Sequence, residues 1–395
     1  MTRKRTSKRT EKRASKRNNI KSKSSKRSRI NRLQSGSGKK FKLIELKVEI
    51  SKEDKIASGN FGVVFKGKLV NNTDVVVKFD KVITDSFNRE ANIAQRLKNH
   101  PNINKILGIY KGKEISYMNN KNTNQIIPLD QMGLVFRYCK QGSLKSVLDK
   151  TDNYASLFNL LDDSKRNLCG LRRLIGFMID VANGLDYIQG EGCYHLDIAA
   201  RNVLIDGDDV AKITDFGLST CKTKEISGQI PIFSSSPELI TKKSPIIEKS
   251  DMWSFGMLMF ETFSLGERPF NGVDIKNLVK IYQNNNYNNN TLSRNHLSIE
   301  TISTKLSILK EEVYGTEIIA LIKKCIKKKP SERINFNDAK KNLIDIFEKL
   351  TNKIDDNNDP LNNTSIKNYY FNRWKGGKNK GTPPTLEKLI GKIIS

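Results

Sequence analysis

The chain has 395 residues and a net charge of +28 at pH 7, from 70 Lys and Arg against 42 Asp and Glu. This length can hold roughly two or three domains, and no apolar run reaches the ~18 residues that a membrane span needs, so no transmembrane segment is expected. Five cysteines without a Cys-x-x-Cys spacing and only three histidines argue against a zinc site or a disulfide framework, and they favour a reducing, intracellular compartment, cytoplasmic or nuclear.

Residues 1–40 form a strongly basic segment, with seventeen Lys and Arg against one acid, Glu11. The segment has almost no apolar spacing and cannot bury enough surface to offset the cost of ordering, so we expect a disordered basic tail. Such a tail can target the nucleus, attract nucleic acid non-specifically or contact an anionic membrane surface. The alternative is a solvated tail without a specific partner. No aromatic residues are interleaved with the charges, so sequence-specific reading of nucleic acid is not expected.

From about residue 41 to residue 138, short runs rich in β-branched residues surround one helical stretch. The helical stretch begins near Ser86, and Phe87, Ile93, Ala94 and Leu97 are its apolar positions. This pattern predicts an antiparallel sheet that carries a single helix. The predicted strands are Val48–Ile50, Val63–Phe65, Val75–Val77, Ile106–Ile109 and Leu134–Phe136.

Beyond Ser143 the spacing of apolar residues is typical of helices. From Leu171 to Ile188 they recur every three or four positions, which predicts a long helix packed on a core. The chain therefore resolves into a β-rich small lobe followed by a mainly helical large lobe. Two polar spans, Lys113–Gln125 and Lys150–Asn167, are expected to be surface loops.

Several motifs in chain order carry residues suited to phosphate chemistry. Ile56–Phe65 contains small residues that let backbone N–H groups approach a polyphosphate. Lys78 ends a β-branched run, and Glu90 lies on the predicted helix, where it can form an ion pair with that lysine. Further on, His195–Asn202 places a carboxylate before an amide, and Asp215–Gly217 adds a second carboxylate before a glycine.

Together these motifs resemble the glycine-rich loop, the strand lysine, the H-R-D-L-x-x-x-x-N loop and the D-F-G turn of eukaryotic protein kinases. Ser236–Glu238 is similar to the A-P-E motif, Ser250–Gly256 to the buried central helix, and Pro330–Arg333 supplies the late arginine of the family. The resemblance runs from about residue 43 to about residue 352. It implies an α+β, two-lobed kinase fold: a domain at 41–352 (small lobe about 41–138, large lobe about 139–352), between the tail 1–40 and a polar basic tail at 353–395.

The resemblance implies transfer of the γ-phosphoryl group of ATP to a protein hydroxyl. Asp197 would orient the acceptor hydroxyl and take its proton, Lys78 would hold the α- and β-phosphates, and Glu90 would orient that lysine. Asn202 and Asp215 would hold Mg²⁺ ions. The implied nucleotide-contacting residues are Ala57, Gly59, Phe61, Gly62, Val64, Lys78, Arg137, Cys139 and Leu204.

Other residues receive supporting roles from the same resemblance. Asp251 is expected to accept backbone hydrogen bonds from the loop that carries Asp197, and His195 is expected to pack under the D-F-G turn. Arg333 is expected to pair with Glu238 and form a buried bridge across the large lobe.

The residues around the catalytic loop favour tyrosine as the acceptor. Ala199–Arg201 resembles the tyrosine kinases, and the lysine that serine/threonine kinases carry two residues after the catalytic aspartate is absent. Pro231 stands where serine/threonine kinases place a threonine. Ser234, however, replaces the tryptophan expected in a tyrosine kinase, so a serine/threonine or dual-specificity kinase is the alternative.

Two further departures from the family pattern bear on regulation and activity. Leu196 replaces the arginine of H-R-D, the usual receiver of a phosphorylated activation loop, and Leu218–Ser235 contains no tyrosine, so loop phosphorylation should matter little. Ala57 replaces the first glycine of the phosphate loop, which should weaken nucleotide binding modestly. With Ser234, these departures suggest a nucleotide-binding pseudokinase scaffold as another hypothesis. The basic tail suggests a third, a nucleic-acid-binding protein whose main functional part is that tail.

Overall fold

The computed structural model describes residues 43–58, 62–80, 85–118, 123–128, 131–150, 163–221, 230–241, 249–270, 273–283 and 312–355. These residues belong to one compact unit. The predicted tail at 1–40 and residues 356–395 lie outside the described residues, as do Gly59 and Phe61 of the predicted phosphate loop. What the sequence predicts for them stays a prediction.

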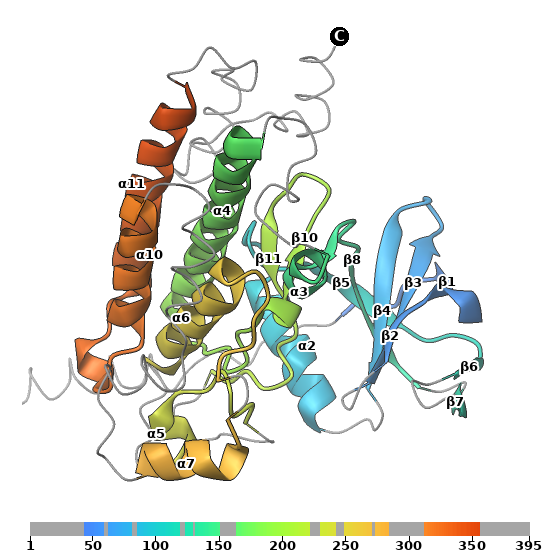
Figure 1. The fold of residues 1–395 in the computed structure, drawn as a ribbon. Coiled ribbons are helices and arrows are strands. Elements are labelled where there is room, and N and C mark those ends of the chain that lie inside the picture. Colours follow the sequence, from blue (N-terminus) through green and yellow to red (C-terminus); the bar gives the residue numbers. More distant parts are fainter. Residues whose placement is uncertain are drawn as a thin grey trace, which may run out of the picture. The chain divides into compact units, whose positions relative to one another are not determined.

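The small lobe is built on an antiparallel sheet with the strand order β1-β3-β4-β8-β5, and β2 also pairs with β3 (Figure 1). Along β3 and β4 the buried residues alternate with less buried ones, as expected for strands whose two faces differ in burial, and most of the buried positions are β-branched or aromatic. The antiparallel sheet predicted from the sequence is confirmed. Its strands are β1 Val48–Glu49, β2 Lys55–Ser58, β3 Gly62–Leu69, β4 Asp74–Asp80, β5 Ile106–Tyr110 and β8 Gly133–Arg137, with a short 3₁₀ turn, η1 Lys52–Asp54, between β1 and β2.

The predicted single helix of the small lobe is α2, Asp85–Leu97. Phe87, Ala91, Ala94 and Leu97 are buried on one face at helical spacing, and Glu90 lies on the same face at 2% exposure. The apolar residues on either side therefore hold a carboxylate inside the molecule, directed toward the sheet.

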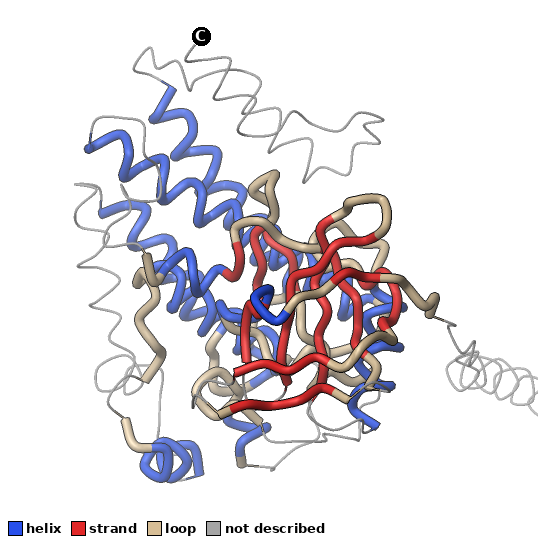
Figure 2. Tube along the Cα trace, turned by 90° about the vertical axis from the view of Figure 1, so that its right-hand side faces the viewer, coloured by secondary structure: helices blue, strands red, loops and turns tan. Residues whose placement is uncertain are grey.

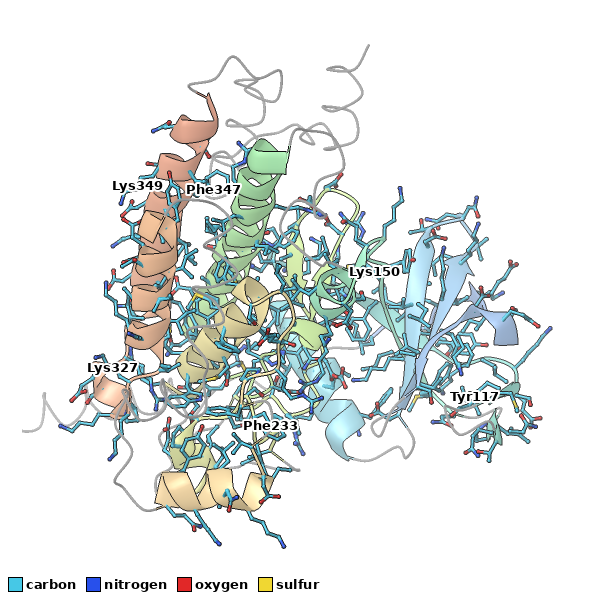
Figure 3. The ribbon with its side chains drawn as sticks, viewed as in Figure 1. Tyr117, Lys150, Phe233, Lys327, Phe347 and Lys349 are labelled. Carbon is cyan, nitrogen blue, oxygen red and sulfur yellow. A yellow bond between two sulfur atoms is a disulfide. The ribbon has the colours of Figure 1, made fainter. Side chains whose placement is uncertain are left out.

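An additional hairpin packs against the face of the sheet that lies opposite α2 (Figure 2), in a part of the chain predicted to be a surface loop. It consists of β6, Ile115–Met118, and β7, Asn124–Ile127. Ile115 and Ile127 pack in one cluster with Phe65, Val77 and Phe79, and the ring of Tyr117, labelled in Figure 3, meets Phe65 edge-on at 5.7 Å. The surface-loop prediction for Lys113–Gln125 is wrong in this part, because the exposed face of the sheet is apolar and needs a cover.

The large lobe is mainly helical, as predicted. Its long helix α4, Asp163–Gly190, lies alongside α11, Phe336–Asp355, and near α6, Ser250–Phe263 (Figure 1). The helix takes the last five residues of the predicted loop Lys150–Asn167. Phe347 of α11 is buried in the core that these helices share (Figure 3). Gly256 of α6 is required by packing, because a Cβ there would lie 2.6 Å from Ile326.

Shorter elements complete the lobe and carry the loops of interest. A three-stranded sheet in the order β11-β10-β9 follows the connection between the lobes. No helix among the described residues is long and apolar enough to span a bilayer. The remaining elements are β9 Gly142–Ser143, α3 Leu144–Leu148, η3 Ala200–Asn202, β10 Val203–Ile205, β11 Ala211–Ile213, α5 Pro237–Ile240, α7 Ile275–Gln283, α10 Glu312–Cys325 and η4 Pro330–Glu332.

Candidate active site

Lys78 on β4 joins two carboxylates that are far apart in the sequence. Its Nζ lies 2.9 Å from both carboxylate oxygens of Glu90 on α2 and 2.8 Å from Oδ1 of Asp215. The predicted Lys78–Glu90 ion pair is therefore present, and Asp215 meets the same amine. These contacts hold the lysine side chain extended between the small lobe and the turn that follows β11.

The charges of the three groups depend on one another. Burial alone would lower the pKa of Lys78, but the charges of Glu90 and Asp215 outweigh burial and raise it, so the amine stays protonated. Burial raises the pKa of Glu90 to about 7, although Lys78 opposes the rise. Burial also opposes ionisation of Asp215, but Lys78 holds the pKa of that carboxyl below its usual range. Asp215 is thus the firmly ionised partner, and Glu90 titrates near neutrality.

The loop that carries Asp197 is fixed by the buried carboxylate of Asp251 on α6, as predicted. Its two oxygens accept hydrogen bonds from the backbone N–H groups of His195, at 2.7 Å, and Leu196, at 2.8 Å. Leu196 has φ of +65°, a conformation that a bulky residue adopts only when its surroundings impose it. These two hydrogen bonds, together with burial of the leucine side chain, account for that conformation.

His195 connects this loop to the D-F-G turn. Burial lowers its pKa despite the nearby charge of Asp251, so the imidazole is neutral. Nε2 lies 3.0 Å from the carbonyl oxygen of Thr214, and Nδ1 lies 3.3 Å from the backbone N–H of Asp197; this pattern assigns the proton to Nε2. The ring also packs 5.1 Å from that of Phe216, which confirms the predicted position.

Asp197 is held by its two neighbours in the loop. The amide nitrogen of Asn202 donates to the carbonyl oxygen and to Oδ2 of Asp197, both at 2.8 Å, and the guanidinium of Arg201 donates to Oδ1. Burial raises the pKa of Asp197, and Arg201 limits the rise. A raised pKa makes the carboxylate a better proton acceptor. Because the amide nitrogen of Asn202 is engaged, its oxygen is the end that can face a cation.

Asn202 and Asp215 fit a magnesium site that a polyphosphate completes. Both offer oxygen atoms, which Mg²⁺ prefers, and the backbone N–H of Thr214 donates to the carbonyl of Asn202 at 3.0 Å, which ties the two segments together. Over the described parts of the chain, no group of three or more His, Cys, Asp or Glu could hold a metal by itself. Mg²⁺ commonly binds one or two protein oxygens together with substrate phosphates, so a site of this kind does not need three protein ligands.

Three of the predicted nucleotide-contacting residues form one row across the sheet. Ala57 pairs with Val64, and Val64 pairs with Lys78, so the three share the face on which Lys78 meets Glu90. Gly62 begins β3, and the backbone of β4 approaches it closely. Glycine is required at this position, because a Cβ would lie 2.1 Å from the carbonyl oxygen of Phe79.

The other predicted contacts lie at the connection between the lobes. Arg137 ends β8, and Leu204 lies on β10, which pairs with β9 just after that connection. Cys139 is 4% exposed, and burial raises the pKa of its thiol to about 12, so the backbone at this position is the group available to a ligand. Their joint contact with a nucleotide stays a prediction.

Comparison with known proteins decides the family. The family model described as protein tyrosine and serine/threonine kinase matches residues 50–343. The chain belongs to this kinase family. It therefore contains a protein kinase domain, and the arrangement of Lys78, Glu90, Asp197, Asn202 and Asp215 is the candidate active site of that domain.

Similar proteins include several tyrosine-protein kinases. Tyrosine-protein kinase Fer of Rattus norvegicus is 29% identical over 313 residues, which cover 77% of this chain and 32% of Fer. Fer of Homo sapiens is 30% identical over 308 residues, with 75% and 31% covered. Tyrosine-protein kinase csk-1 of Caenorhabditis elegans is 31% identical over 240 residues, with 59% and 39% covered. This kinase thus spans about a third of the length of the relatives it matches.

Sequence reasoning missed one residue that supports the catalytic loop of the kinase. Glu261 of α6 accepts the backbone N–H of Ala200 at 3.0 Å, and burial raises the pKa of its carboxyl although the Ala200 hydrogen bond opposes the rise. A signal was available, because Glu261 is the only charged residue between Trp253 and Leu265. A charge within the most apolar stretch of a chain usually has a buried partner.

An apolar cluster occupies the position where a kinase with the H-R-D arginine would hold a phosphate. Leu196 packs with Tyr194 and Leu239, and Ile230 lies against them. Ile230 belongs to the activation segment, residues 215–238, and Leu239 lies on α5, the short helix that begins at the end of that segment. Apolar contact therefore joins this segment to the loop that carries Asp197. That loop phosphorylation matters little stays a prediction.

The expectation that the cysteines form no disulfide is wrong for one pair. Cys193 and Cys221 are joined by a disulfide, whereas Cys139 and Cys325 are free thiols. No cysteine motif in the sequence predicts this pair. The fold of the chain brings the two residues together.

We expect phosphoryl transfer by the kinase to decrease as the pH falls through about 7, where Glu90 takes up a proton. Protonation removes the negative charge of Glu90 that pairs with Lys78. The amine of Lys78 then pairs with Asp215 alone, which draws it away from the phosphates that it is predicted to contact. The measurement is kcat/KM for ATP as a function of pH, with folding monitored by circular dichroism. In Glu90→Gln the activity should be low and the inflection near neutrality absent; an unchanged inflection in that variant would assign the titration to another group.

Proposed function

We propose that this protein is an active kinase that transfers the γ-phosphoryl group of ATP, with Mg²⁺, to a hydroxyl of a protein substrate, and that tyrosine is the favoured acceptor. The observation that carries the proposal is the amine of Lys78 between Glu90 and Asp215. In this arrangement one cation can bind phosphate oxygens, and the Asp197–Asn202 pair supplies a base and a metal ligand.

Each residue of the site has a role that follows from the chemistry of its side chain. Lys78, oriented by Glu90, binds the α- and β-phosphates and offsets their charge. Asp215 and Asn202 would hold Mg²⁺, which when bound neutralises charge on the β- and γ-phosphates. Asp197 orients the acceptor hydroxyl and accepts its proton. His195 keeps the backbone of Asp197 in place through the hydrogen bond at Nδ1.

Tyrosine is favoured as the acceptor because two observations agree, and a third departs from them. The relatives described above are named tyrosine-protein kinases. Arg201, from the tyrosine-kinase-like Ala199–Arg201 run, donates to the carboxylate of Asp197, and the lysine that serine/threonine kinases carry two residues after this aspartate is absent. Ser234, which is buried, is the residue that departs from this pattern. A serine/threonine or dual-specificity kinase is the second candidate.

Phosphoamino-acid analysis tests the acceptor. We expect the purified chain, incubated with labelled ATP, Mg²⁺ and a mixture of tyrosine and serine/threonine peptides, to yield mainly phosphotyrosine. Omission of Mg²⁺ should abolish incorporation. If phosphoserine or phosphothreonine predominated, the assignment of tyrosine as the favoured acceptor would be wrong. Stabilisation by ATP and Mg²⁺ without any incorporation would instead support the pseudokinase hypothesis that Leu196, Ala57 and Ser234 raise.

We also propose the domain limits 41–352 and an intracellular place of action, cytoplasmic or nuclear. The first is supported by the family match at residues 50–343, and the second by the need for ATP and by the basic segment 1–40. That segment would attract nucleic acid or another anionic surface non-specifically. Binding should then weaken steeply with salt and disappear when residues 1–40 are deleted.

A further inference from the structure

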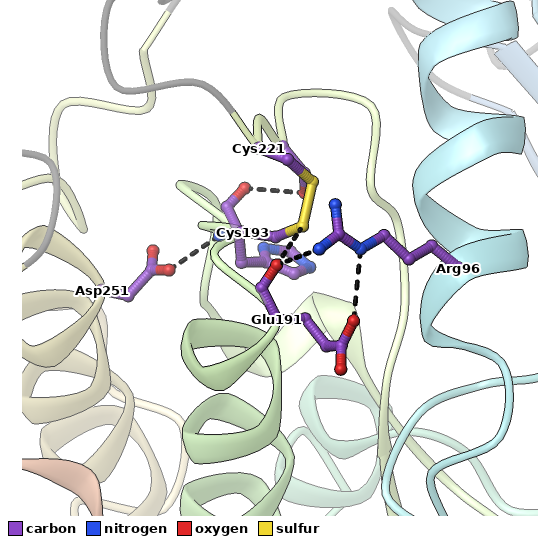
Figure 4. The surroundings of a disulfide bond; sticks show 7 residues. Arg96, Glu191, Cys193, Cys221 and Asp251 are labelled. Atoms are coloured by element: carbon purple, nitrogen blue, oxygen red, sulfur yellow. Dashed lines mark hydrogen bonds and ion pairs between the residues drawn. A yellow bond between two sulfur atoms is a disulfide. The ribbon is translucent and has the colours of Figure 1, made fainter. Parts of the chain in front are cut away.

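The disulfide Cys193–Cys221 connects two functional segments of the kinase (Figure 4). Cys193 lies two residues before His195, at the start of the catalytic loop. Cys221 lies four residues after Gly217, in the first part of the activation segment. The bond therefore fixes the exit of the D-F-G turn to the loop that carries the catalytic carboxylate.

The backbone would bring the two cysteines together without the bond. Tyr194 and Thr220 exchange hydrogen bonds in both directions, at 2.8 and 3.0 Å, and Ser219 Oγ donates to the carbonyl oxygen of His195 at 3.1 Å. In an antiparallel pair, the residues next to such a bonded pair face each other at the closer spacing, with Cα atoms about 4.5 Å apart. The Cα atoms of Cys193 and Cys221 are 3.9 Å apart. The thiols of a reduced chain would therefore already be neighbours.

The two cysteines differ in their exposure to solvent. Cys193 is fully buried, and Cys221 is partly exposed. Sγ of Cys193 lies 3.7 Å from the carbonyl oxygen of Glu191, which could accept a hydrogen bond from a thiol. The same carbonyl accepts a bond from Arg96 of α2, the helix that carries Glu90 (Figure 4). The pair thus joins a partly exposed cysteine to a buried partner that tolerates the reduced form, and it has an indirect contact with the helix that carries Glu90.

We propose that Cys193 and Cys221 form a redox-controlled pair, and that their oxidation stabilises the assembled active site by fixing the start of the activation segment to the catalytic loop. The inference rests on the proposed kinase activity. The oxidised pair coexists with the contacts of Lys78 to both Glu90 and Asp215, so the bond is compatible with the complete site, and it would disfavour conformations in which the two linked segments part. A cross-link that only one conformation can form shifts the population toward that conformation.

The chemistry requires a two-electron oxidant, and we name a peroxide. The thiolate of Cys221 attacks one peroxide oxygen, the O–O bond breaks, and a sulfenic acid and one water result. The thiol of Cys193 then attacks the sulfenic sulfur: the S–S bond forms, the S–O bond breaks, and the hydroxyl group leaves with the proton of the Cys193 thiol as a second water. Two thiols and one hydrogen peroxide thus give one disulfide and two waters. A dithiol reductant reverses the state by thiol–disulfide exchange and is itself oxidised to a disulfide.

The test compares the full chain after treatment with dithiothreitol and, once the reductant is removed, with hydrogen peroxide. Peptide mapping under non-reducing conditions should find Cys193 linked to Cys221 only after peroxide. Hydrogen exchange at residues 216–221 should be slower in the oxidised form, and transfer to a peptide should be faster by about fivefold or more, the lower range of allosteric coupling. Cys221→Ser should behave like the reduced chain in both states, whereas Cys325→Ala, at a buried thiol far from the pair in sequence, should keep the full response.

The outcomes separate this inference from the proposed function. Absence of the linked peptide, or a linked peptide with equal exchange in the two states, would overturn the redox pair. Equal transfer rates in the two states of an active enzyme would overturn its control of activity. If neither state transfers phosphate but the linked form shows slower exchange and greater thermal stabilisation by ATP and Mg²⁺, the kinase proposal fails and the redox pair stands.

Discussion

Asp197→Asn is expected to lower kcat for peptide phosphorylation by about 10²–10⁴-fold, the usual contribution of a positioned general base. Asparagine keeps the size of the side chain but cannot accept the proton of the substrate hydroxyl. It also upsets the local hydrogen bonds, because Arg201 and Asn202 both donate to the present carboxylate and an amide offers only one acceptor oxygen to these two donors. KM for ATP should change little, since the contacts of Lys78 do not involve Asp197.

The measurement is the initial rate of transfer from labelled ATP to a tyrosine peptide, together with the thermal shift that ATP and Mg²⁺ produce. The variant should retain most of the thermal shift, which separates loss of chemistry from loss of folding. Asp74→Asn provides a matched control, because this aspartate is 41% exposed, lies at the start of β4 and pairs only with Lys66 among the contacts of the small lobe described here. Equal rates for the wild type and Asp197→Asn would falsify the assignment of the base.

The sequence predicted the contacts that depend on local pattern. Lys78 and Glu90 could be found because a strand of alternating residues and a helix of regular spacing fix the direction of each side chain. The partners of Asp251 and Arg333 followed instead from the resemblance of their motifs to those of protein kinases. For these two residues the family pattern, and not spacing or element order alone, predicted partners that are far apart in the chain.

The features that the sequence did not predict depend on packing between distant segments. The strands of the hairpin β6–β7 have only four residues each, and the sequence between them is polar and Asn-rich. The hairpin packs on the sheet through Ile115, Ile127 and the ring of Tyr117, which meets Phe65. Similarly, Cys193 and Cys221 are 28 residues apart, and only the pairing of Tyr194 with Thr220 makes them neighbours. The sequence showed that Leu196 lacks the charge of an arginine, but not that Tyr194, Leu239 and Ile230 would surround it.

The other large effect is expected on stability, from the ion pair between Arg333 and Glu238. The Arg333 side chain is fully buried, and its guanidinium donates to both carboxylate oxygens of Glu238, at 2.6 and 2.8 Å. It also donates to the carbonyl oxygens of Lys249, at 2.9 Å, and Lys327, at 2.8 Å, and it lies over the ring of Trp253. The bridge therefore joins α5 at the end of the activation segment, the start of α6 and the segment after α10.

Arg333→Met should lower the free energy of unfolding by about 3–5 kcal/mol, because it leaves the Glu238 carboxylate and two carbonyl groups without their buried cation. Methionine keeps much of the volume over Trp253, so the loss reports on charge and hydrogen bonding more than on a cavity. At roughly 2–4 °C per kcal/mol for a domain of this size, Tm should fall by about 6–20 °C.

Thermal and urea unfolding of the two proteins measure this difference, and Lys329→Met is the matched control. Lys329 pairs with Glu332 at 3.3 Å in the same region, but its side chain is 75% exposed, and an exposed pair contributes only about 0–1 kcal/mol. The two substitutions remove one cation each and differ chiefly in burial. If both variants lost the same stability, the Arg333–Glu238 bridge would not be what holds these segments of the large lobe together, and the buried contacts of α6 with α10 would have to account for it.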